Sequence, residues 1–119
     1  MKEKIFDEKE IFGMKASLYD SKIYEEMMLI FKMCGDATRL KIMTVLSKRS
    51  CSVNDLSQIL EMSQSAVSHQ LSKLRKANLV KFNKVGLNVF YALMDDHVMN
   101  IFNQALDHVL EECNHFHEN

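Results

Sequence analysis

Four side chains near the C-terminal end of this 119-residue chain have the types and the spacing of a metal site. They are Asp95, His97, His108 and Glu111, and the pattern around them predicts one continuous helix. Because an α-helix turns once in about 3.6 residues, the eleven steps from His97 to His108 return the second imidazole to within roughly 20° of the first, but about 16 Å further along the axis. One ion therefore cannot bind both ends of a single helix.

A second copy of the helix would complete the site. If two copies pack antiparallel across a twofold axis, Asp95 and His97 of one chain come level with His108 and Glu111 of the other, which gives two sites in a homodimer. Two imidazoles and two carboxylates suit four-coordinate Zn²⁺, and Co²⁺ should bind as well. Four protein ligands leave no open position for water, and the sequence has no H-E-x-x-H, nucleophile elbow or glycine-rich phosphate loop, so an enzyme is not expected.

Each of these residues taken alone has a simpler explanation. Asp95 suits the N-cap of the helix, His97 and His108 suit a surface, and Glu111 suits an acidic exposed face. The hypothesis depends on the joint spacing, because a shift of one residue rotates a side chain by roughly 100° around the helix.

The remaining thiols and imidazoles support weaker alternatives. Cys34 and Cys51 suit small buried residues, although a thiol pair that senses oxidants is an alternative. Three residues near the C-terminal end, Cys113, His115 and His117, form a further cluster. The simplest interpretation of this cluster is a polar tail. If its side chains served as extra ligands, they would favour six-coordinate Ni²⁺ or Co²⁺.

Composition indicates one ordinary domain with a segregated charge. The chain is 47% hydrophobic and 26% charged, and no apolar run reaches the roughly 18 residues of a membrane span. The first four residues lead into no signal-peptide core, so a cytoplasmic location is expected. The net charge of −1 conceals a stretch, residues 62–94, with five Lys or Arg and no acid, followed from Asp95 onward by six acids and no Lys or Arg. The first stretch suits phosphate, and the second suits a cation.

The periodicity predicts a mainly α fold with one β-hairpin. A charged arm precedes a helix over residues 18–33; Asp36 can cap the next helix, and Ser52 with Asp55 forms a capping box for the third. A fourth helix is predicted over residues 64–77, then strands over 79–83 and 87–93 joined by a turn at 84–86, and a last helix over 96–113 with a buried apolar stripe. The predicted organisation is an arm (1–17), a winged helix-turn-helix and dimerisation domain (18–113) and a tail (114–119).

The third and fourth helices with their short turn predict DNA binding. The exposed side of the fourth helix has small hydroxyls, an imidazole and amides without acids, which suits base edges in a major groove while lysines neutralise phosphates. A polar, solvated helix is the simpler alternative. The residues expected near bases are Gln64, Ser65, Ser68 and His69; Lys73 and Lys76 are expected nearer the backbone, and Lys81, Lys84 and Asn88 of the hairpin at flanking phosphates.

Three stretches resemble the ArsR/SmtB family of winged-helix metal-sensing repressors. Residues 35–40 (GDATRL) look like the family's entry to its second helix, residues 63–71 (SQSAVSHQL) like its recognition helix, and residues 89–93 (VFYAL) like its second wing strand. The pattern D-x-H, ten residues, H-x-x-E is matched in full, and in the family's zinc sensors it is the intersubunit site on the last helix.

The chain also departs from the family in two places. A Cys-x-Cys site on the third helix is absent, because Ser52 and Asn54 occupy its positions and Cys51 lies one place off. The wing glycine, Gly86, is followed by Leu87 where the family often has an arginine.

The resemblance implies a metal-released repressor. A metal-free homodimer would bind an inverted-repeat operator, and Zn²⁺ between the last helices would release it and derepress genes for metal efflux or sequestration. In relatives the free ring N–H of one metal-bound histidine, here His108, is accepted by a backbone carbonyl that maps near Asn78. The alternatives are a redox-sensing regulator that uses cysteine thiols, a Ni²⁺ or Co²⁺ sensor, a metal-buffering or dimeric interaction module without an operator, and a zinc hydrolase.

Overall fold

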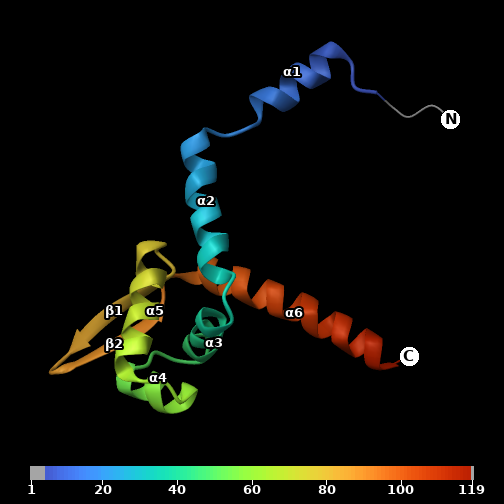
Figure 1. Ribbon diagram of the computed structural model, residues 1–119. Coiled ribbons are helices and arrows are strands. Elements are labelled where there is room, and N and C mark those ends of the chain that lie inside the picture. Colours follow the sequence, from blue (N-terminus) through green and yellow to red (C-terminus); the bar gives the residue numbers. More distant parts are fainter. Residues whose placement is uncertain (1–4, 119) are drawn as a thin grey trace.

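The computed structural model describes the backbone of residues 5–118 and the side chains of residues 5–112. It is mainly α with one antiparallel β-hairpin, as the sequence predicted (Figure 1). The elements are α1 (Glu8–Ala16), α2 (Ser21–Cys34), α3 (Ala37–Leu46), α4 (Val53–Leu60), α5 (Gln64–Lys76), β1 (Val80–Val85), β2 (Asn88–Leu93) and α6 (Asp96–Glu118).

Local capping explains where the central helices begin. Asp36 accepts a hydrogen bond from the Arg39 amide at 3.0 Å and opens α3. Ser52 and Asp55 form the predicted capping box of α4, with the Asp55 amide 3.0 Å from the Ser52 hydroxyl and the Ser52 amide 2.9 Å from the Asp55 carboxylate. Ser63 caps α5 through the Ala66 amide at 3.1 Å. Each cap satisfies an amide that the first turn of a helix leaves without a partner.

The hydrophobic core lies between α3, α4 and α5 and extends under the hairpin to the start of α6. It consists of Ile42, Met43, Leu46, Cys51, Leu56, Val67, Leu71, Leu74, Ala77, Leu79, Val80, Leu93, Val98 and Phe102. The chain passes from α4 to α5 through Glu61, which has a left-handed backbone conformation (φ 54°). This tight turn fixes α5 against α3 and α4 and leaves one side of α5 open to solvent.

The hairpin is attached to this body by backbone hydrogen bonds. The amide of Cys51 donates to the Tyr91 carbonyl at 3.0 Å and the Tyr91 amide donates back at 2.7 Å. The register pairs Val85 with Asn88, so the two-residue turn is Gly86–Leu87 and not residues 84–86 as predicted. A positive φ at the first turn residue only (Gly86, 63°) fits a type II′ turn, whose twist matches the strands.

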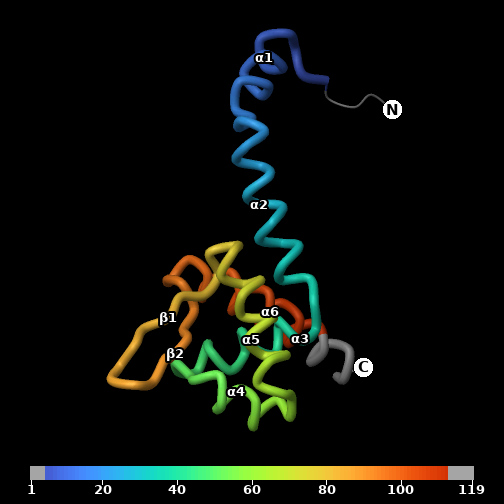
Figure 2. Tube along the Cα trace, turned by 60° about the vertical axis from the view of Figure 1, so that its left-hand side comes forward, coloured from blue at the N-terminus to red at the C-terminus, as the bar shows by residue number. Residues whose placement is uncertain are grey.

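Three helices, α1, α2 and α6, extend away from the core in Figure 1, and Figure 2 shows the same for α1 and α2. The predicted N-terminal arm contains α1, which a capping box between Asp7 and Glu10 opens (2.8 and 3.2 Å). Every residue of α2 is at least partly exposed, and α6 continues to Glu118, beyond its predicted end. The molecule is correspondingly elongated, with extents of 64 × 44 × 21 Å.

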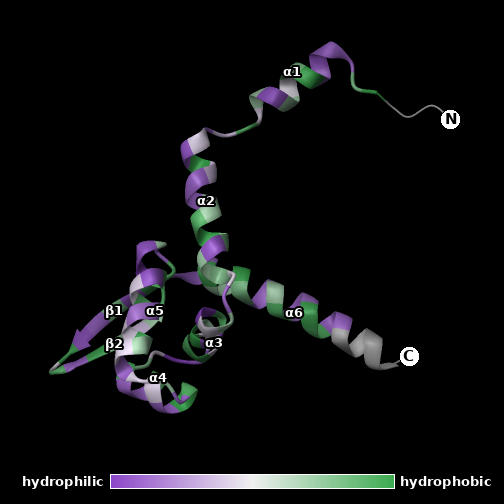
Figure 3. Ribbon diagram, viewed as in Figure 1, coloured by the Kyte–Doolittle hydropathy of each residue, from purple (hydrophilic) through white to green (hydrophobic). Residues whose placement is uncertain are grey.

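Among the described residues, many apolar side chains of α2 and α6 are exposed. Figure 3 shows apolar segments along both helices. The predicted stripe of α6 is buried only at Val98 and Phe102, whereas Ile101 and Val109 are 48% and 53% exposed. Phe31 of α2 is 61% exposed. Among the residues described, no helix is both long and apolar enough to cross a lipid bilayer.

Candidate DNA interface and metal site

The exposed side of α5 carries the four residues predicted to lie near bases. Val67, Leu71 and Leu74 bury the opposite side of the helix in the core. Gln64, Ser65, Ser68 and His69 are all exposed. The structure therefore brings these four side chains together on one surface at the N-terminal half of α5, where backbone amides add positive potential.

Two contacts organise the beginning of α5. The Gln64 side-chain amide donates to the Asn54 side-chain oxygen of α4 at 3.1 Å, and the hydroxyls of Ser63 and Ser65 lie 3.3 Å apart. Sequence reasoning missed Asn54 as a member of this surface. The helix-turn-helix motif indicates only that α4 and α5 pack against each other, because its tight turn joins the C-terminal end of α4 to the N-terminal end of α5.

The predicted phosphate contacts lie on α5 and the hairpin. Lys76, Lys81, Lys84 and Asn88 are exposed, and Lys73 is half-buried. The pKa of Asp36 is lowered mainly by the hydrogen bond from the Arg39 amide, and the charge of Lys73 makes the smallest contribution in the same direction.

One cation was missing from the predicted surface. Arg75 holds its guanidinium carbon 4.3 Å from the centre of the Phe82 ring, and that ring lies 5.9 Å from the ring of Tyr91. A guanidinium stacked on a ring loses less conformational freedom when it meets a phosphate. Its place in the acid-free stretch was the available signal, whereas the stacking depends on the fold of the hairpin.

The first half of the predicted metal site is assembled within one chain. One carboxylate oxygen of Asp95 accepts from the Val98 amide at 3.0 Å and caps α6, and the other lies 3.7 Å from Nδ1 of His97. The His97 side chain is 92% exposed. The capping explanation of Asp95 and its availability as a ligand are therefore compatible.

The second half lies further along α6 and is not joined to the first. Nε2 of His108 is 3.4 Å from a carboxylate oxygen of Glu112, one turn away, while the neighbouring Glu111 is exposed. Within the described part of a single chain, no three His, Cys, Asp or Glu side chains gather closely enough to hold a metal ion. The side chains of Cys113, His115 and His117 lie outside the described residues.

A surface hollow of about 350 Å³ connects the first half-site with the end of α5. Asp95 and His97 line it together with Lys76 and Asn78, so a residue of the recognition helix and the predicted coupling position both adjoin the half-site. Glu26 of α2 also lines the hollow, and nothing in the sequence indicated this, because α2 is about 70 positions away.

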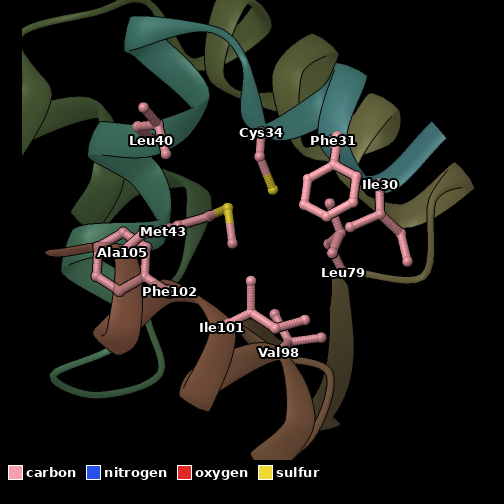
Figure 4. A pocket seen from close by; sticks show the side chains of 10 residues that line it. All are labelled: Ile30, Phe31, Cys34, Leu40, Met43, Leu79, Val98, Ile101, Phe102 and Ala105. Atoms are coloured by element: carbon pink, nitrogen blue, oxygen red, sulfur yellow. The ribbon is translucent and has the colours of Figure 1, made fainter. Parts of the chain in front are cut away.

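Cys34 lies in an apolar cavity of about 130 Å³ between α2, α3 and α6 (Figure 4). Burial raises the pKa of the Cys34 thiol and, together with Asp55, that of the Cys51 thiol. Because thiolate is the reactive form, a raised pKa leaves both thiols protonated and slow to react with oxidants. This chemistry weighs against the redox-sensing alternative.

The fold and the exposed helix are those of a winged helix-turn-helix protein. The model of bacterial regulatory proteins of the arsR family matches residues 36–81. A transcriptional repressor SmtB homologue of Synechocystis is 42% identical over 87 residues, which are 73% of this chain and 66% of that protein, so the chain spans slightly less than two thirds of it. A cadmium resistance regulatory protein, a CadC homologue of Staphylococcus aureus, is 37% identical over 83 residues, 69% of each chain.

The chain belongs to the ArsR family of transcriptional regulators. Its members are DNA-binding proteins and not enzymes. The homodimeric winged helix-turn-helix DNA-binding domain of a Mycobacterium bovis protein has the same fold, with a TM-score of 0.78 over 84% of this chain and 94% of that domain, at 20% identity.

Proposed function

We propose that this chain is a metal-released transcriptional repressor that acts as a homodimer and responds to Zn²⁺. The observation that carries the proposal is the placement of two metal-capable pairs on one exposed helix. Asp95 and His97 lie together at the start of α6, and His108 and Glu111 lie about three turns later. Each pair has too few ligands by itself, and an antiparallel second copy of α6 would supply the other two.

The exposed apolar surface supports a dimer of this kind. Phe31, Ile101 and Val109 lie on α2 and α6 and are each about half exposed or more. Burying such side chains in a second copy is favourable by about 25 cal/mol for each Å² of apolar surface removed from water. The M. bovis domain of the same fold is described as homodimeric.

The donor set suits zinc. Two imidazole nitrogens and two carboxylate oxygens satisfy a tetrahedral Zn²⁺ without leaving an open position. A bound ion would link α6 of one chain to α6 of the other. Co²⁺ or Ni²⁺ is the alternative, favoured if the terminal residues 113–117 add ligands.

The half-site is well placed to influence DNA binding. Asn78 follows the recognition helix, with its amide 2.9 Å from the Arg75 carbonyl, and lines the same hollow as Asp95 and His97. A metal-binding His108 from the partner keeps one ring N–H that needs an acceptor, and the backbone carbonyl near Asn78 would provide it. A coupling free energy of about 1 to 3 kcal/mol is enough to change operator occupancy.

The test is a titration of the protein bound to a duplex that the protein itself selects from random sequences. Zn²⁺, Co²⁺ and Ni²⁺ are added at fixed salt, and operator affinity is measured by fluorescence anisotropy. We expect Zn²⁺ to release wild-type protein and to have little effect on His97→Ala or His108→Ala. Asp107→Ala, an exposed acid on the same helix, is the matched control and should respond as wild type.

His108→Asp separates binding from coupling. The aspartate offers a ligand oxygen but no ring N–H, so zinc should still bind with moderate affinity and release DNA poorly. Release with normal coupling would show that the link to Asn78 is wrong, and release by peroxide instead of zinc would support the redox alternative.

A further inference from the structure

Arg39 is the one charged residue that is buried among the described residues, at 9% exposure. Its Nε donates to the Met33 carbonyl at 2.6 Å, and its Nη1 donates to the side-chain oxygen of Gln70 at 3.0 Å. Asp36 lies 4.0 Å from the same Nη1. These partners belong to three places in the fold: the end of α2, the N-cap of α3 and the recognition helix α5.

Burying an arginine side chain at this position is energetically costly. Removing a charge from water costs several kcal/mol unless it is paired, and an apolar side chain of similar size packs as well. A guanidinium instead provides direction, because its N–H groups leave a rigid plane at fixed angles. With Met33 at one edge and Gln70 at another, the plane sets the distance and the angle between the C-terminal end of α2 and the middle of α5.

Gln70 is placed to control how α5 is rotated. It is half-buried and lies between the buried side of the helix, at Leu71, and the exposed side, at His69. A rotation of α5 about its axis would change the direction in which Ser68 and His69 face and would break the Gln70 contact. The apolar core resists such a rotation less specifically, because hydrophobic contacts have little directional preference.

We propose that Arg39 is a positioning residue for operator recognition, which fixes the rotation of α5 relative to α2 through Gln70. This inference rests on the proposed reading of DNA by α5 and adds the residue that determines its sequence discrimination. In the proposed dimer, whose exposed apolar surface includes α2, the same contact carries the geometry of the interface to the recognition helix. Loss of the contact reduces discrimination between sequences without reducing attraction to DNA in general.

The test compares a duplex selected from random sequences by wild-type protein with a scrambled duplex of the same composition. Gln70→Met removes the acceptor for Arg39 and removes no cation. We expect the affinity for the selected duplex to fall about tenfold, with unchanged affinity for the scrambled duplex and an unchanged salt dependence. Gln58→Met, the same change at an exposed glutamine of α4, should leave the ratio of the two affinities as in wild type.

Two further variants distinguish positioning from direct contact and from stability. Gln70→Glu keeps an acceptor for Arg39 but loses the amide donor, so it should restore the ratio, whereas a base contact made by the Gln70 amide would stay lost. Arg39→Lys keeps the charge without the rigid fork and should lower the ratio like Gln70→Met, with the double variant no worse than either alone. All proteins are compared at a temperature at which circular dichroism shows them fully folded.

If Gln70→Met lowers the melting temperature but leaves the ratio of affinities unchanged, the contact has a purely structural role. That result would leave the proposed function intact and overturn this inference. An equal loss of affinity for both duplexes would overturn it as well. If wild-type protein selects no sequence, the proposed function fails and the inference fails with it.

Discussion

At the level of single residues, Asp95 uses its two carboxylate oxygens differently. One caps α6 through the Val98 amide, and the other faces His97. Asn is as good an N-cap as Asp, whereas an amide is a far weaker ligand for a divalent cation. The two roles can therefore be separated by substitution.

We expect Asp95→Asn to keep the stability of the metal-free protein within about 0.5 kcal/mol, because the cap survives, and to lower zinc affinity at least tenfold. Asp95→Ala should lose the cap as well and cost about 1 kcal/mol. Urea denaturation and zinc titration against a competing chelator measure the two effects. Zinc affinity equal to wild type in Asp95→Asn would leave Asp95 as a cap alone.

Two carboxyl groups make stability depend on pH. In the folded state the pKa of Asp36 is lowered, mainly by the hydrogen bond from the Arg39 amide. The pKa of Asp55 is lowered, mainly by the hydrogen bond from the Ser52 amide. A carboxyl whose folded pKa lies below its unfolded value of about 3.9 stabilises the fold above that value, and this stabilisation is lost as pH falls through the folded pKa.

Unfolding free energy measured in urea should therefore fall as pH drops below about 4. The variant with Asp36→Asn and Asp55→Asn keeps both caps and removes both titrations, so its stability should decline less steeply between pH 5 and pH 3. Identical slopes for the two proteins would contradict the assignment.

Residue contacts were predictable where the partner is close in sequence. The caps at Asp36 and at Ser52 with Asp55 join positions three apart, so the sequence pattern was sufficient. The contact of Arg39 with Gln70 joins residues 31 apart, and the burial of an arginine follows only from how α3 and α5 pack.

At the level of elements, boundaries followed the sequence where an apolar stripe and a cap agree. The predicted start of α5 is the observed one, and its end differs by one residue. Helix α1 was missed because its apolar residues form no stripe and its capping box alone opens it. The hairpin turn was misplaced because β1 extends to Val85, directly before Gly86, whereas β2 begins only at Asn88.

The wing offers a prediction about its turn. A Cβ at Gly86 would meet no atom within 4 Å, so Gly86→Ala introduces no clash and costs only the strain of a positive φ, about 1 kcal/mol. Gly13→Ala, in the middle of α1 and equally free of contacts, should cost nothing and raise the helix content. Denaturation and circular dichroism test the pair; a much larger loss for Gly86→Ala would mean that the turn has packing partners.

At the level of the whole molecule, the extended helices determine what a single chain leaves unfinished. The stripe of α6 was predicted to be buried, and in the chain it is buried only at Val98 and Phe102. A sequence pattern shows that a side of a helix is apolar, but the identity of the surface that covers it depends on tertiary and quaternary packing. The same holds for the metal ligands, whose types and spacing were readable while their meeting point was not.

Charge on the exposed stripe should separate the protomers. Ile101→Glu or Phe31→Glu should give a monomer in sedimentation experiments and, with it, lose tight zinc binding, because a buried unpaired carboxylate is costly. Leu87→Glu at the wing tip, where the native side chain is 97% exposed, is the matched control and should stay dimeric. A dimer that persists in both stripe variants would place the interface elsewhere.

The wide separation of His97 and His108 along α6 has a quantitative consequence for sensing. If each ion needs ligands from two polypeptides, then the apparent metal affinity depends on how much protein is present, and dilution below the association threshold weakens the response even at constant free zinc. Cellular abundance of the regulator would then set its detection limit as much as the chemistry of its ligands.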